Sequence, residues 1–144
     1  MRMNPPSAAV ATAVTFVWLG MVLAISFLEA PLKFRAPGVT VPIGLGIGRI
    51  IFRALNRVEI VLACVLIAAV AVGGPPASVS VLTGVTVLLL ALQLLVIRPK
   101  LNRRSARVLA GETLTRSRAH HFYVAAESVK VLTLLALGIG VLTV

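Results

Sequence analysis

Two long uncharged apolar runs constrain this chain more than any other feature of its sequence. They cover Ala8–Leu28 and Ser78–Ile97. A membrane-spanning helix needs roughly 20 predominantly apolar residues, so each run is long enough to cross a bilayer. Two further runs, Ile60–Gly73 and Val131–Val144, are shorter, and they reach that length only if their helices begin among the preceding polar residues. The chain is therefore predicted to be a polytopic membrane protein.

The overall composition supports the same class. Of the 144 residues, 59% are hydrophobic and only 12% are charged, whereas soluble domains carry about 25% charged residues. We predict an all-α fold, an integral membrane four-helix bundle. Its single domain covers residues 1–144, with spans at about 8–30, 50–73, 78–97 and 121–144.

Proline and glycine mark the expected ends of these spans. We expect the first to stop at Pro31 and the third at Arg98–Pro99. The stretch Ile43–Gly48 alternates glycine with aliphatic residues. It lacks the preceding strand and the Gly-Lys-Ser/Thr sequence of nucleotide-binding loops, so we expect a flexible or closely packed segment at the membrane interface.

The net charge of +10 comes mainly from two segments between spans. The connector between the first two spans holds Lys33, Arg35, Arg49, Arg53 and Arg57, and the connector between the last two holds Arg98, Lys100, Arg103, Arg104, Arg107, Arg116 and Arg118. The short segment Gly74–Ala77 has no cation. By the positive-inside rule, both basic connectors are predicted to be cytoplasmic and both termini outside, in a bacterial plasma (inner) membrane. Cations in these positions predict anionic lipids as partners rather than nucleic acid.

Polar side chains within the apolar spans are the candidate functional residues. In the predicted topology Glu29, Glu59, Gln93 and Glu127 all fall in the cytoplasmic half of the membrane, one in each span. Ionisable groups are costly there and are often functional. His120, Tyr123, Glu127 and Lys130 share one helical face through spacings of three and four. A second stripe runs through Arg49, Arg53, Asn56 and Glu59.

These two stripes leave three interpretations open. The carboxylates pair with cations and only allow the bundle to close, Glu127 with Lys130, and Glu29 and Glu59 with nearby arginines. Alternatively the stripes line a cytoplasm-facing pocket for an anionic or polar ligand, or they hold a metal or haem. The chain has no Glu-x-x-His pair of the di-iron type. We therefore assign no metal ligands, no catalytic residues and no cofactor.

Two single residues carry further predictions. Trp18 falls in the middle of the first span, away from the membrane interface, which indicates packing rather than anchoring. Cys64 is the only cysteine, so it forms no disulfide within the chain. We expect it to be a buried, inert thiol.

Several motifs of the first 60 residues resemble a known family. Trp18-Leu19-Gly20, Phe27, Pro31, Phe34 and the later Gly48-Arg49-Ile50-Ile51-Phe52 look like the first half of the transmembrane-protein-205-like group. The resemblance implies a four-span membrane protein and no defined activity. A fainter similarity is to four-span haem proteins of the protoporphyrinogen-oxidase type, but the first span here has no histidine for haem ligation.

The leading functional hypothesis is a non-enzymatic integral membrane protein. It would be an accessory subunit of a larger membrane complex or a binder of lipid-like anions. A small membrane redox enzyme or cofactor-binding protein, using an inner-leaflet cluster of carboxylates and histidine, is the competing class. A transporter is a third possibility, and so short a chain would then need a homo-oligomer to enclose a path.

Overall fold

All elements of the described chain are helical. The computed structural model describes residues 2–114 and 118–144, and no strand occurs in this part of the chain. The elements are α1 Pro5–Val22, η1 Leu23–Glu29, α2 Ala30–Leu32, η2 Lys33–Arg35, α3 Val41–Gly73, α4 Ala77–Leu92, η3 Gln93–Ile97, α5 Arg98–Leu109 and α6 Arg118–Leu142. Of these, η1 and η3 are π-helical and η2 is a 3₁₀ turn.

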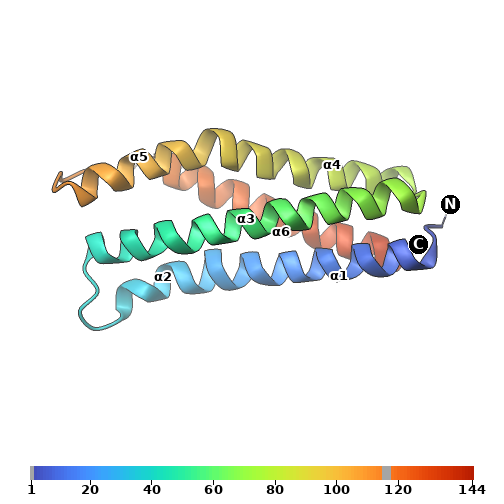
Figure 1. The fold of residues 1–144 in the computed structure, drawn as a ribbon, viewed down its shortest axis with the longest axis horizontal. Helices are drawn as coiled ribbons and strands as arrows, with labels where there is room; N and C mark the ends of the chain where they lie inside the picture. The colour runs from blue at the N-terminus through green and yellow to red at the C-terminus, as the bar shows by residue number, and fades with distance from the viewer. Residues whose placement is uncertain (1, 115–117) are drawn as a thin grey trace.

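These elements join into four helices that are each long and apolar enough to cross a membrane: Pro5–Arg35, Val41–Gly73, Ala77–Leu109 and Arg118–Leu142. Consecutive helices are antiparallel, so both termini and the turn after α3 lie at one end, with the two longer connectors at the other (Figure 1). The helix α1 packs against α3 and α6, and α4 packs against α6. The predicted helical bundle with four apolar helices is confirmed.

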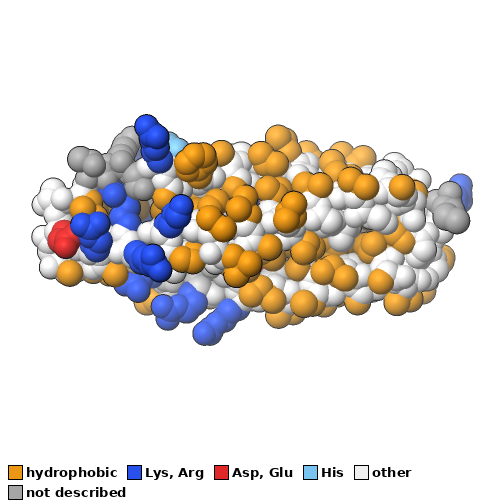
Figure 2. All heavy atoms as spheres, turned by 90° about the horizontal axis from the view of Figure 1, so that it is seen from above, with side chains coloured by type: hydrophobic (Ala, Val, Ile, Leu, Met, Phe, Trp, Pro, Cys, Tyr) orange, Lys and Arg blue, Asp and Glu red, His pale blue; other side chains and the backbone are white. Residues whose placement is uncertain are grey.

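The outer surface of the bundle is largely apolar. Figure 2 shows hydrophobic side chains along most of the visible face and lysines and arginines gathered at one end. Leucines such as Leu88 and Leu132 are exposed on the outer surface, whereas others such as Leu66 and Leu134 are fully buried between the helices. An exterior of this kind is favourable against lipid and costly in water. Cys64 is also exposed on this exterior, so the prediction of a buried thiol was wrong.

The helices continue through Pro31 and Pro99, where breaks were predicted. Proline lacks an N–H and clashes with the carbonyl four residues earlier in a regular helix. Each proline here follows a π-helical segment, in which the residue before the proline bonds to the carbonyl five residues back, as Ala30 does to Ile25. The wider π-helical turn accommodates the ring, so both helices extend past the predicted boundary.

The glycine-rich stretch after the first helix is also helical. Helix α3 begins at Val41, where the side chain of Thr40 accepts a hydrogen bond from the Ile43 N–H at 3.4 Å. The prediction of a flexible segment is therefore wrong, whereas close packing is confirmed. A Cβ atom at Gly44 would overlap the ring of Phe34, so glycine here lets the end of the first helix approach α3.

Candidate functional site

Four polar side chains from three helices meet in the interior of the bundle. They are Glu59 from α3, Gln93 from η3, and Glu127 and Lys130 from α6, and each is at most 3% exposed. We call these four residues, together with Trp18 from α1, the buried cluster. It therefore contains a residue from each of the four helices.

The ammonium group of Lys130 is the centre of the buried cluster. Its Nζ donates to Glu59 Oε1 at 2.5 Å and to Gln93 Oε1 at 2.7 Å. Glu127 Oε1 lies 2.8 Å from the same atom, as an ion-pair contact. Three oxygens thus surround a group that has three protons to donate.

Two further bonds close the buried cluster. The indole Nε1 of Trp18 donates to Glu59 Oε1 at 2.9 Å, and Gln93 Nε2 donates to Glu127 Oε2 at 3.2 Å. A buried charge needs such partners, because desolvating an ion costs several kcal/mol. The buried cluster therefore ties all four helices together at one level.

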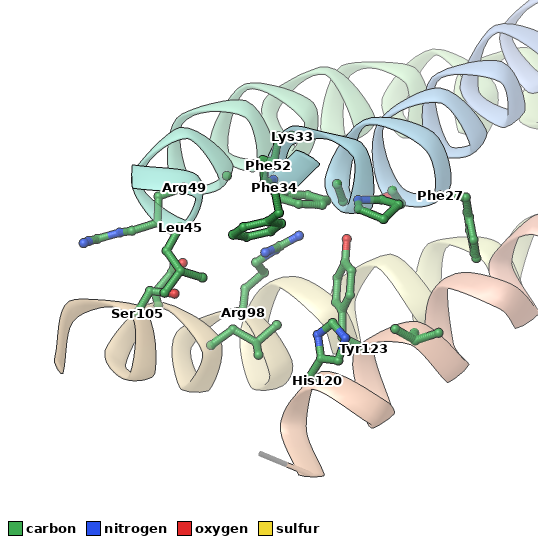
Figure 3. A pocket seen from close by; sticks show the side chains of 18 residues that line it. Phe27, Lys33, Phe34, Leu45, Arg49, Phe52, Arg98, Ser105, His120 and Tyr123 are labelled. Atoms are coloured by element: carbon green, nitrogen blue, oxygen red, sulfur yellow. The ribbon is translucent and has the colours of Figure 1, made fainter. Parts of the chain in front are cut away.

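A cavity of about 600 Å³ lies next to the buried cluster, toward the basic end of the bundle. Figure 3 shows its wall formed by the end of the first helix and the start of α3 on one side, and by α5 and α6 on the other. Its described lining combines apolar and aromatic groups with cations, hydroxyls and an amide. The lining residues are Ser26, Phe27, Ala30, Pro31, Lys33, Phe34, Gly44, Leu45, Gly48, Arg49, Phe52, Arg98, Leu101, Asn102, Ser105, His120, Tyr123 and Val124.

Arg98 is one of the polar groups that point into this cavity (Figure 3). Its Cζ lies 4.0 Å from the ring centroid of Phe52 and 4.3 Å from that of Tyr123, and the residue is 9% exposed. The two rings meet edge to face, with centroids 5.8 Å apart. Such contacts between a guanidinium and aromatic rings hold the cation in place.

The same guanidinium has unused donors. Within the described chain, Nε and Nη2 of Arg98 are buried and have no hydrogen-bond partner. These two nitrogens form one edge of the planar group, which is the edge that binds two oxygens of a single carboxylate or phosphate. The arrangement can therefore accept an oxyanion with two parallel hydrogen bonds.

Two more cations line the cavity. Lys33 Nζ lies 5.6 Å from the ring centroid of Phe52, the ring that Arg98 also contacts. Lys33 also forms an ion pair of 3.5 Å with Glu29. Arg49 also lines the cavity, and its guanidinium points away from Arg98 in Figure 3. No carboxylate is among the described lining residues. The cavity is thus strongly cationic.

Tyr123 connects the cavity with the buried cluster. It lines the cavity, contacts Arg98 through its ring, and is close enough to the Glu127 carboxylate to interact with it electrostatically. Tyr123 and Glu127 are four residues apart on α6, so they share one face of the helix. The buried cluster consequently fixes the helix face that presents Tyr123 to the guanidinium.

The structure divides the predicted site residues between two places. Glu59, Gln93, Glu127 and Lys130 form the buried cluster, whereas Arg49, His120 and Tyr123 line the cavity. The expected pairing of Glu127 with Lys130 is confirmed. Glu59 pairs with Lys130 and Glu29 with Lys33, so the expected arginine partners were wrong.

Three predicted residues lie in neither place. Glu29 pairs with Lys33 but does not line the cavity. Arg53 is exposed, Asn56 is half-buried, and neither lines the cavity. The stripe along α3 therefore contributes Arg49 and Glu59 but not the two residues between them. Helical spacing identified the face only approximately, since α3 packs on different partners at its two ends.

Sequence reasoning missed two important residues. Trp18 was assigned to packing alone, but its N–H also bonds to Glu59. Arg98 was assigned to the end of a span, because a cation before proline is typical of a boundary. The position of Phe52 and Tyr123, which bury Arg98, depends on tertiary contacts between segments distant in sequence.

Comparison of the chain with protein-family models, curated proteins and solved structures found no match. Within residues 2–114 and 118–144, no group of three or more histidine, cysteine, aspartate or glutamate side chains is arranged to hold a metal ion.

Proposed function

We propose that this chain is a non-enzymatic integral membrane protein that binds a lipid-like anion in the cavity beside Arg98. The observation that carries the proposal is the Arg98 guanidinium, which is nine-tenths buried with two donors unpartnered. A buried polar donor without a partner is costly. An oxyanion bound at Nε and Nη2 removes that cost and supplies the missing negative charge.

The depth of the cavity supports a membrane-derived ligand. At a rise of 1.5 Å per residue, Phe52 lies about 32 Å along α3 from its Gly73 end, and Glu59 lies about 21 Å from it. The hydrocarbon core of a bilayer is about 30 Å thick. With the Gly73 end at one edge of the hydrocarbon, Arg98 and Phe52 fall at the other edge, where lipid headgroups lie.

The lining chemistry supports binding rather than catalysis. Cationic groups and aromatic rings recognise charge and shape, and the buried carboxylates Glu59 and Glu127 are engaged by Lys130 away from the cavity wall. The buried cluster has a structural role in this account. It fixes the helices that carry Tyr123 and Arg98.

We place the basic connectors in the cytoplasm and both termini outside, in a bacterial plasma membrane. The gathering of cations at one end of the bundle supports this orientation by the positive-inside rule and gives that end an affinity for anionic lipids. Membership of the transmembrane-protein-205-like group is part of the same proposal. It rests on the Trp18–Gly20 and Gly48–Phe52 motifs.

Native mass spectrometry of protein released gently from its own membrane tests the proposal. Wild-type protein is expected to retain a small anionic amphiphile, and Arg98→Gln is expected to lose it. Arg53→Gln is the matched control, because Arg53 is exposed and lies outside the cavity. Equal retention by wild type and Arg98→Gln would contradict the proposal, as would a wild-type protein that carries no such mass.

A further inference from the structure

We infer that the anion in the Arg98 cavity is a lipid with a phosphomonoester headgroup, which enters sideways from the bilayer between the end of the first helix and the start of α6. This inference rests on the proposed function and adds two things to it. It names the headgroup class, and it names the route of the hydrocarbon chain.

The charge of the cavity favours a dianion. Three cations line the cavity: Arg98, Arg49 and Lys33. Glu29 neutralises part of the Lys33 charge through their ion pair. About two positive charges therefore remain. A phosphomonoester carries about −1.5 to −2 at pH 7, whereas a phosphodiester or a carboxylate carries only one negative charge.

The donor arrangement favours the same group. Nε and Nη2 of Arg98 are buried and unpartnered, and this edge of a guanidinium pairs with two oxygens of one anion. A phosphomonoester has three terminal oxygens, so one remains for a second cation. Lys33 is suited to this role, because its ammonium and the Arg98 guanidinium both lie against the ring of Phe52. A carboxylate would have no oxygen left for it.

The packing of the helices opens a route for the hydrocarbon chain. Helix α1 packs closely against α6, whereas η1 and α2 make few contacts with it. In Figure 1 the α2 end of the first helix lies beside α3 and apart from the start of α6. Phe27 and Val124 lie at this gap, and both line the cavity while remaining 41% and 40% exposed. An apolar, lipid-exposed gap beside a cationic cavity suits a headgroup inside and a chain outside.

A competition between lipids of matched acyl chains tests the headgroup. Purified protein is mixed with equal amounts of phosphatidic acid, phosphatidylglycerol and the free fatty acid, and bound species are counted by native mass spectrometry. Phosphatidic acid is expected to exceed each competitor by about tenfold or more, since it gains a charge-assisted hydrogen bond. Equal binding of phosphatidylglycerol or the fatty acid would overturn the phosphomonoester headgroup and leave the proposed function standing. Binding of none of the three would contradict both.

The entry route is tested separately with variants on α6. Val124→Trp fills the gap and is expected to reduce bound phosphatidic acid about tenfold. Val129→Trp is the matched control, because Val129 is exposed on the same helix but does not line the cavity. Inorganic phosphate is titrated alongside. Full displacement of phosphatidic acid by inorganic phosphate would overturn sideways entry and favour a soluble phosphate ligand. Unchanged lipid binding by Val124→Trp would overturn entry through this gap.

Discussion

Lys130 on α6 donates a 2.5 Å hydrogen bond to Glu59 on α3, across 71 residues of sequence and with both side chains almost fully buried. Without this bond Glu59 would lose its cationic partner on α6, whereas Lys130 would keep its ion pair with Glu127 on its own helix. The bond makes the two helices depend on each other for stability.

Replacement of Lys130 by methionine is predicted to destabilise the bundle strongly. The change leaves Glu59 and Glu127 buried without their cation, and breaking a buried pair costs about 3–5 kcal/mol. Thermal unfolding in detergent, followed by circular dichroism, measures the effect. Arg107→Met is the control, since the exposed Arg107–Glu112 pair contributes at most about 1 kcal/mol. Equal melting temperatures of the two variants would refute the assigned role of Lys130.

Trp18 is predicted to couple energetically to Glu59. Trp18→Phe removes an N–H bond to a charged acceptor and is expected to cost about 1.5–3 kcal/mol. A double-mutant cycle with Glu59→Gln isolates the pairwise part, which is expected to be about 1 kcal/mol. Additive effects of the two changes would show that Trp18 contributes only by packing.

Two glycines of α3 are predicted to respond in opposite directions to alanine. At Gly44 the added Cβ overlaps the ring of Phe34, so overpacking is expected to destabilise by about 1–3 kcal/mol. At Gly46 the Cβ meets nothing within 4 Å, so Gly46→Ala is expected to stabilise by about 0.5–1 kcal/mol through helix propensity. The melting temperatures of the two variants check the prediction. Parallel shifts would contradict the close packing of Phe34 on α3.

The orientation is predicted from the distribution of cations. In a Cys64→Ser background, a cysteine at Pro75 is expected to react with a membrane-impermeant maleimide in intact cells. A cysteine at Ala36 is expected to react only after permeabilisation. The opposite pattern would reverse the assigned orientation without changing the bundle.

The sequence predicts the bundle well because its signals are local. Apolar runs of bilayer length identify four helices without knowledge of their neighbours, and the pair Glu127–Lys130 follows from their spacing on one helix. The helix boundaries at Pro31 and Pro99 were wrong, since proline ends a regular helix but is accommodated after a π-helical turn. The local sequence did not indicate that the helix would form a wider, π-helical turn before each proline.

The candidate site was only half predictable for a related reason. Glu59, Gln93, Glu127 and Lys130 were identifiable because polar groups in apolar runs are conspicuous. Arg98 was not, because its burial depends on Phe52 and Tyr123 from two other helices. The sequence places Arg98 beside other boundary cations, and only the fold distinguishes it from them.

The most direct test of the central claim is the affinity of purified protein for a short-chain phosphatidic acid, measured by isothermal titration calorimetry in detergent. Wild type and Arg53→Gln are expected to bind it with the same dissociation constant. Arg98→Gln is expected to bind at least about 100-fold more weakly, as two charge-assisted hydrogen bonds are lost. Equal affinity of Arg98→Gln and wild type would contradict the account.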